Sequence, residues 1–228
     1  IILSLCFTLL PATHLYLELN SLSNANPILL ISFLLISTLG ISHGAFDGKI
    51  IWDNGSKRNA FILYFIYLLI SLLGFLLWVL LPSLGLFILL TISIIHFGYS
   101  DLVCIDNKYK YLKYSWGFSM TFLPALFHPS SVSEIFYLLT NSNAIPSSLS
   151  FLRYLIFLNL IFLSSHILLS LIRTKDKIYF LLMGELIIMI VFAYFLHPLI
   201  WFGFYFCFLH GIRACLLYTS PSPRDVEE

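Results

Sequence analysis

Residues 60–81 read AFILYFIYLLISLLGFLLWVLL, a run of 22 residues without an Asp, Glu, Lys or Arg. A helix that crosses the roughly 30 Å hydrocarbon core of a bilayer needs about 20 apolar residues, at about 1.5 Å of rise each. A helix on the surface of a soluble protein would show polar residues along one face, and this run shows none. The segment therefore predicts an integral membrane protein.

Similar apolar runs recur along the chain. Of its 228 residues, 60% are hydrophobic and 10% are charged, whereas ordinary soluble domains have roughly 45–50% and about 25%. Eight candidate spans lie at residues 1–17, 27–43, 60–81, 84–99, 115–127, 151–172, 178–196 and 199–214. We predict an all-α fold, a polytopic integral membrane helix bundle with about eight transmembrane helices, the first of them incomplete.

No Pro-rich or Ser-rich linker divides the chain, so residues 1–214 are predicted to form a single membrane-embedded helical domain. Residues 215–228 read CLLYTSPSPRDVEE and resemble the translation of a transposase adapter used in sequencing libraries. We expect these residues not to be native. Ile1 begins inside an apolar run, without a Met, so we expect the domain to be truncated at both ends.

Basic residues alternate between the connections that join the spans. Nine of the twelve Lys and Arg residues lie in the connections 44–59, 100–114 and 173–177, while the intervening connections at 18–26, 82–83, 128–150 and 197–198 have none. Cytoplasmic connections are enriched in Lys and Arg, so the pattern predicts that the three basic loops are cytoplasmic in a multi-pass cell-membrane protein. The formal charge of +1 leaves no basic face for a nucleic acid, and no nucleic-acid partner is expected.

This orientation predicts three histidines at one depth. His43 ends the second span, His96 lies near the inner end of the fourth, and His210 lies past the midplane of the eighth. Ionisable groups inside a membrane are costly and mark functional sites, and neutral imidazole is the commonest protein ligand of transition metals. We predict that His43, His96 and His210 are metal ligands. The alternative is three separate histidines, each hydrogen-bonded to a backbone carbonyl.

Two aspartates follow candidate ligands by about one helical turn. Asp47 is four residues after His43, and Asp101 is five residues after His96. A carboxylate that accepts the second ring N–H of a ligand fixes the tautomer and orientation of the imidazole. We predict that Asp47 and Asp101 support the ligands in this way. The alternative is that they are helix-end acids facing lysines; the roles of two further groups, His166 and Glu185, stay open.

Three motifs carry a resemblance to a known family. They are Ser42-His43-Gly44-Ala45-Phe46-Asp47, then His96-Phe97-Gly98 with Asp101, then His197-Pro198-Leu199 followed by Tyr205-Phe206-Cys207-Phe208-Leu209-His210 and Arg213. In this order, from about residue 30 to 214, they resemble the Brp/Blh family of bacterial and archaeal membrane proteins, which are beta-carotene 15,15'-dioxygenases.

The resemblance implies an Fe(2+) cofactor held by His43, His96 and His210 in a helical membrane bundle. It also implies cleavage of the central double bond of beta-carotene with O2 to give two retinals. The expected surroundings are the lipid bilayer, and a retinal-binding opsin is the expected downstream recipient. No catalytic residue beyond the metal ligands is assigned.

The last motif departs from the family pattern H-S-x-R-H. Gly211 replaces the serine and Ala214 replaces a fourth histidine ligand. We expect Ala214 to result from the truncation beside the adapter-like segment, and a genuine three-histidine homologue stays open. The depth argument places His197 on the far side of the membrane, so we expect a structural turn residue there.

Three other functions stay open beside the oxygenase. They are a carotenoid- or haem-binding helical bundle, a transporter with a histidine proton relay, and a membrane desaturase or hydroxylase. Desaturases place close-spaced histidine pairs on a helix, and transporters show internal repeats and broken helices; the sequence has neither feature. The aromatic content of 17%, with several rings beside the candidate ligands, suits an apolar tunnel for a polyene.

Overall fold

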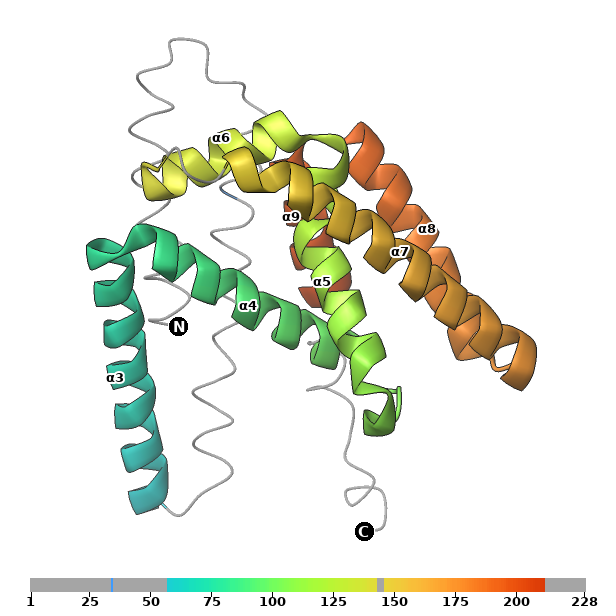
Figure 1. Ribbon diagram of the computed structural model, residues 1–228. Helices are drawn as coiled ribbons and strands as arrows, with labels where there is room; N and C mark the ends of the chain where they lie inside the picture. Colours follow the sequence, from blue (N-terminus) through green and yellow to red (C-terminus); the bar gives the residue numbers. More distant parts are fainter. Residues whose placement is uncertain (1–33, 35–56, 143–145, 212–228) are drawn as a thin grey trace.

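The computed structural model of the chain describes residues 57–142 and 146–211, together with residue 34 (Figure 1). Within these residues every regular element is helical and no strand occurs, so the prediction of an all-helical fold is confirmed for this part of the chain. The first two predicted spans, at 1–17 and 27–43, lie outside the described residues. The total of eight spans therefore stays a prediction.

Four of the described helices are long and apolar enough to cross a membrane. Their spanning segments are Asn59–Leu80, Pro82–Asp101, Leu149–Thr174 and Lys177–Phe195. Between 11% and 28% of the residues in these segments are buried inside the protein, so most of the apolar side chains point outward. Outward-facing apolar helices of this length match a hydrocarbon environment.

The first two described spans are joined by a tight turn. Helix α3 (Lys57–Leu80) contains all but the last residue of the run quoted above, and a single residue, Leu81, separates it from α4 (Pro82–Asp101). Leu81 precedes a proline and has φ −138° and ψ 70°. The residue before a proline is driven out of the α region, and proline is favoured at the first position of a helix. Pro82 therefore ends α3 and begins α4.

Helix α5 (Lys110–Phe127) occupies the centre of the described bundle and packs against α4, α6, α7, α8 and α9. Its stripe of Leu112, Trp116, Met120 and Leu123 is fully buried, at the helical spacing that places residues on one face. The predicted span at 115–127 was too short, because the helix begins five residues earlier than expected.

Lys113 is one of the basic residues predicted to lie in a loop, and the structure corrects this. It lies in the first turn of α5 and is 2% exposed. Its Nζ donates to Oδ1 of Asn107 over 2.8 Å and lies 5.2 Å from the centre of the Tyr99 ring. Both contacts compensate for the removal of the ammonium group from water.

The connection at 128–150, predicted to be an outer loop, contains a helix. Helix α6 (Pro129–Thr140) is 12 residues long and ends at Asn141, which has the left-handed φ of 50°. Val132 of this helix packs into a second core cluster with Ala125 of α5 and Ile156 of α7. At 12 residues, α6 is too short to span a bilayer. The apolar stripe that packs it against the rest of the protein is only about three turns long.

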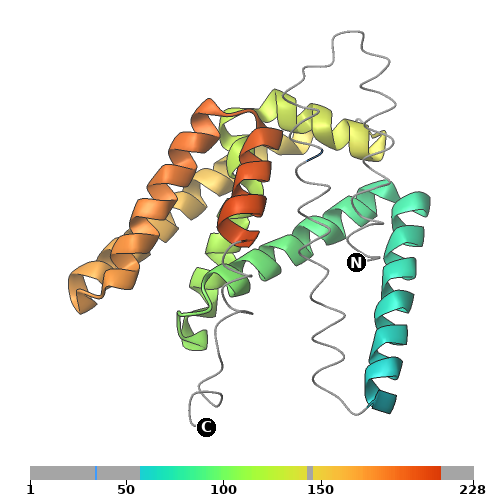
Figure 2. The same cartoon turned by 180° about the vertical axis from the view of Figure 1, so that it is seen from behind.

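The last described part of the chain forms three further helices. Helix α7 (Pro146–Thr174) and helix α8 (Lys177–Phe195) run side by side, as Figures 1 and 2 both show. The short helix α9 (Pro198–Phe204) continues into a π-helical turn, η2 (Tyr205–His210). The predicted spans at 151–172, 178–196 and 199–214 correspond to these elements, although the last is described only to residue 211.

Two contacts hold α5 against its neighbours. Gly117 of α5 meets the backbone of α4, where an added Cβ would overlap the carbonyl oxygen of Ile94; Gly98 of α4 meets the carbonyl of Lys113 in the same way. On the other side, Asn159 of α7 donates to the carbonyl of Ser115 over 3.0 Å. Small residues let membrane helices approach closely, and polar side chains bond across the contact.

The connections that carry basic residues lie in the same half of the described structure. In Figure 1 the start of α3, the α4–α5 connection and the turn between α7 and α8 lie in the lower half of the picture, while α6 lies at the top. Apart from α6, which lies across the top of the picture, the helices alternate in direction, as expected of a bundle that crosses a membrane. The lower ends of α4 and η2 also carry the candidate site.

Candidate functional site

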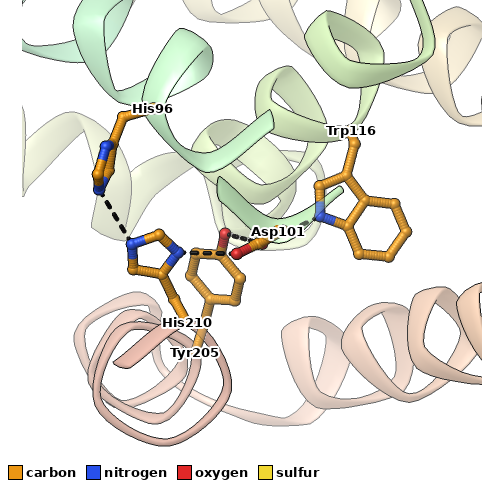
Figure 3. Close-up of polar contacts among 5 residues, drawn as sticks. All are labelled: His96, Asp101, Trp116, Tyr205 and His210. Carbon is orange, nitrogen blue, oxygen red and sulfur yellow. Dashed lines mark hydrogen bonds and ion pairs between the residues drawn. The ribbon is translucent and has the colours of Figure 1, made fainter. Parts of the chain in front are cut away.

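Two of the predicted histidines meet at the point where α4 and η2 end (Figure 3). Nε2 of His96 lies 3.1 Å from Nε2 of His210, and the two ring centres are 4.9 Å apart. These residues are 114 positions apart in the chain. The tertiary structure thus brings together the two candidate ligands that it describes.

Asp101 is the centre of the polar contacts around this pair. Its Oδ1 lies 2.8 Å from Nδ1 of His210, and its Oδ2 accepts from the hydroxyl of Tyr205 over 2.6 Å and from Nε1 of Trp116 over 3.1 Å. Figure 3 shows the three donors converging on the carboxylate. His210, Tyr205 and Trp116 are fully buried, and Asp101 is 4% exposed. A buried carboxylate needs such donors to offset its lost hydration.

The carboxylate determines the proton position on His210. An ionised carboxylate only accepts hydrogen bonds, so Nδ1 of His210 carries the proton that faces Asp101. The Nε2 atom of a neutral imidazole then carries a lone pair, and this atom faces His96. His210 therefore presents a lone pair toward the second imidazole.

The π-helical turn explains how Tyr205 and His210 reach the same carboxylate. Residues five apart on an α-helix differ by about 140° around its axis, so their side chains diverge. The wider turn of η2 spans both residues and brings the two side chains to the two oxygens of Asp101. π-helical turns occur most often at functional sites. The local backbone thus orients one histidine together with its support.

Aromatic rings pack around His210, the buried member of the pair, while His96 is exposed. The Phe97 ring lies 4.8 Å from that of His210 in a T-shaped arrangement, and the Phe206 ring is stacked on His210 at 5.9 Å. Phe97 also contacts the Tyr205 ring at 5.1 Å. Phe97 and Tyr205 belong to the main apolar core of the protein and Phe206 packs against it, so the His210 side of the site is removed from bulk water.

The other half of the predicted site lies outside the described residues. This holds for the ligand His43 and for its supporting carboxylate Asp47. Asp101, expected to support the neighbouring His96, instead contacts His210 from a distant part of the chain. The spacing in the sequence predicted that Asp101 supports a histidine. Which histidine it contacts depends on how α4 and η2 cross.

The remaining described histidines lie elsewhere. His166 of α7 contacts the hydroxyl of Tyr111 over 2.8 Å, and His128 contacts the carbonyl of Tyr194 over 3.1 Å. His197 is the N-cap of α9, where its Nδ1 accepts from the backbone N–H of Leu199 over 3.4 Å. The structure thus places His197 at a turn, the role expected for it.

Trp116 is a site residue that sequence reasoning missed, and the role of Tyr205 was not foreseen. Tyr205 stood in the motif only as an aromatic beside a candidate ligand, and Trp116 stood in no motif. Their contacts with Asp101 depend on the π-helical turn and on the close crossing of α4 and α5. The local sequence pattern signals neither of these features.

The spacing of the two imidazoles suits a shared metal ion. Two nitrogens bound at about 2.1 Å, roughly 90° apart, lie about 3.0 Å from each other, and the observed Nε2–Nε2 distance is 3.1 Å. Within the described residues no group of three or more His, Cys, Asp or Glu side chains could hold a metal. The distance between His96 and His210 is thus compatible with two positions of a metal site.

Comparison with known proteins places the chain among its relatives. The family model described as beta-carotene 15,15'-dioxygenase matches residues 34–224. A protein named beta-carotene 15,15'-dioxygenase, from uncultured marine bacterium 66A03, is 34% identical over 185 residues. The match covers 78% of this chain and 65% of that relative, so the chain spans about two thirds of its length. No solved structure matches. The chain belongs to the beta-carotene 15,15'-dioxygenase family.

Proposed function

We propose that this protein is a membrane iron(II)-dependent dioxygenase that cleaves the central double bond of beta-carotene with O2 to give two retinals. The observation that carries the proposal is the pair of imidazoles at 3.1 Å, one of them held by a buried carboxylate, in a chain of this family. The relative's name supports carotene as the substrate class. An opsin that takes up retinal is the downstream recipient we expect.

His96 and His210 would hold the iron together with His43. Bound by neutral imidazoles with positions left open, the iron would supply activation of dioxygen beside the double bond. The chain contributes the orientation of these ligands. Asp101 keeps the proton on Nδ1 of His210, so that Nε2 is free of a proton and directed at the site.

The apolar rings have a separate part in the proposed reaction. Phe97 and Phe206 pack against the buried His210, and a hydrocarbon substrate gains by burial against such surfaces. Cleavage at one double bond among many requires that the polyene is held in one register beside the ligands. The reaction needs no nucleophile and no acid–base pair from the chain.

Expression in a carotene-producing bacterium tests the proposal. Two versions would be compared, the chain as given and an Ala214→His variant that restores the ligand expected from the family pattern. We expect retinal in pigment extracts, with a higher yield from the variant. His96→Ala and His210→Ala should abolish retinal formation, whereas His166→Ala, on a neighbouring helix outside the site, should leave it close to the parent level.

The same extracts separate the proposal from other functions. Carotene that copurifies with the protein and stays intact would indicate a carotenoid-binding bundle instead. Retinal formed at the parent level by His210→Ala would remove the histidine pair from the reaction. Metal analysis of the purified protein should give about one iron per chain, and a different resident metal would contradict the assignment of the cofactor.

A further inference from the structure

An open apolar groove lies apart from the histidine pair, since none of its lining residues belongs to α4 or η2. It encloses about 490 Å³ between the end of α5, one face of α7 and a single residue of α8. Its lining is apolar except at two positions, and comprises Leu126, Phe127, Arg153, Phe157, Leu160, Ile161, Ser164 and Ile190. Ser164 donates to the carbonyl of Leu160 over 2.7 Å, so its hydroxyl does not need an acceptor from a ligand.

Arg153 is the charged residue of this groove. Its Nε donates to the carbonyl of Leu126 over 3.2 Å, near the C-terminus of α5. In the described part of the chain the ion pairs are Lys108–Asp106 and His210–Asp101, so no carboxylate there lies at ion-pair distance from the guanidinium. A guanidinium has five N–H donors in a fork that suits a phosphate, and a cation at a membrane requires a headgroup or a counter-charge.

The depth of Arg153 matches the level of lipid headgroups. The span that contains it, Leu149–Thr174, has its midpoint between Ile161 and Phe162. Arg153 lies about 13 Å from that midpoint along the helix, and the half-thickness of the hydrocarbon core is about 15 Å. A span that runs along the membrane normal would place the guanidinium at the boundary between the acyl chains and the phosphates.

The rest of the groove extends from this boundary toward the membrane centre. Phe157, Leu160 and Ile161 follow Arg153 at helical spacing on one face of α7, and Ser164 lies just past the midpoint of the span. From Arg153 to Ser164 the helix rises about 16 Å, which is the depth of one leaflet. A cation at the headgroup level with an apolar groove one leaflet deep has the shape of a phospholipid site.

We propose that this groove binds one membrane phospholipid, with its phosphate on Arg153 and one acyl chain along α7. The phosphate would accept charge-assisted hydrogen bonds from the guanidinium, and the acyl chain would cover Phe157 and Ile161, which are 53% and 50% exposed. A carotene is a hydrocarbon and offers the guanidinium no acceptor. The charge therefore selects a phospholipid over the carotenoid as the occupant.

Native mass spectrometry of the full chain, purified in detergent and stripped of lipid, tests this site. The probes are phosphatidylglycerol and a diacylglycerol with the same acyl chains, which lacks the phosphate. We expect the parent protein to retain one phosphatidylglycerol and little diacylglycerol. Arg153→Gln should reduce retention about fivefold, the effect of one lost Arg–headgroup interaction, and Arg153→Lys should retain more lipid than Arg153→Gln.

Two further variants keep the test decisive. Ile161→Trp fills the groove but keeps the Arg153 contact with Leu126, and should also lower retention of phosphatidylglycerol. Arg173→Gln removes an exposed charge in the last turn of the same helix, outside the groove, and should match the parent. Equal retention of the two probes, or parent-level retention by both Arg153→Gln and Ile161→Trp, would overturn the proposal.

Discussion

At the scale of single residues, Asp101 connects the three parts of the candidate site. It joins the imidazole of His210, the hydroxyl of Tyr205 and the indole of Trp116 across distances of 2.6–3.1 Å. A buried carboxylate of this kind is stable only while its donors remain in place. Its effect on His210 is to set both the tautomer and the direction of the ring.

Asp101→Asn tests this role directly. Asparagine keeps the size of the side chain, but its NH2 group replaces one of the two carboxylate oxygens, so either His210 or Tyr205 loses its acceptor. The loss of such a support lowers metal affinity by about 10–100-fold. Titration of the purified protein with Fe(2+) under anaerobic conditions measures the effect. Asp106→Asn, which removes an exposed carboxylate, is the control, and equal affinities in the two variants would remove Asp101 from the site.

Tyr205→Phe removes one hydroxyl from the same network. The ring contacts of Tyr205 with Phe97 and Trp201 would remain, while Oδ2 of Asp101 would lose its 2.6 Å donor. A hydrogen bond to a charged group contributes about 1.5–3 kcal/mol, so we expect roughly tenfold weaker Fe(2+) binding. Tyr154→Phe, which changes an exposed ring, should have no effect.

Tyr205 and Asp101 both act on His210. The double variant Tyr205→Phe with Asp101→Asn should therefore lose less Fe(2+) affinity than the sum of the two single losses.

At the scale of helices, the crossing of α4 and α5 brings Trp116 to Asp101. Gly98 and Gly117 permit backbone contact at this crossing, because a side chain at either position would overlap a carbonyl of the other helix. Trp116 directly precedes Gly117 on α5, and Asp101 follows Gly98 by three residues at the end of α4. A displacement of α4 relative to α5 would therefore separate Asp101 from its indole donor.

Gly117→Ala should destabilise the protein and weaken the site together. The added methyl would force the helices apart at Ile94, and overpacking of this kind costs about 1–3 kcal/mol. Thermal unfolding in detergent measures the stability, and Fe(2+) titration measures the site. Gly184→Ala is a matched control, since an added Cβ there meets nothing within 4 Å. Identical melting temperatures for the two variants would show that the close crossing is not needed.

At the scale of the whole molecule, the basic connections lie in the same half of the bundle as the C-terminal end of α4, the helix that carries His96 (Figure 1). The enrichment of Lys and Arg in these connections predicts that this end faces the cytoplasm. The phospholipid groove then opens toward the outer leaflet. With this predicted orientation, the histidine pair lies toward the cytoplasmic face and the proposed phospholipid groove toward the outer face.

Cysteine labelling in intact cells tests the orientation. Cys104 is exposed in the α4–α5 connection, and Ser130→Cys would place a thiol at the exposed start of α6. In a background without the other cysteines, a membrane-impermeant maleimide should modify position 130 at once. It should reach Cys104 only after the cells are permeabilised. The reverse order of labelling would place the histidine pair at the outer face.

The long helices could be predicted from the sequence alone. The predicted spans at 60–81, 151–172 and 178–196 agree to within a few residues with the spanning segments of α3, α7 and α8. Apolar length decides these elements, because a backbone in hydrocarbon must satisfy its hydrogen bonds within the helix. Helix formation is then a local property, and local composition is sufficient to find it.

The contacts within the site were decided by the tertiary structure. The sequence indicated His96, Asp101 and His210 as chemically important, but not that Asp101 bonds to the histidine 109 residues away. That contact depends on a π-helical turn and on the direction in which α4 leaves its glycine contact with α5. Neither feature produces a repeating pattern in the sequence. Helices in a membrane are apolar on every side, so their contacts depend on the shapes of particular side chains and not on a hydrophobic stripe.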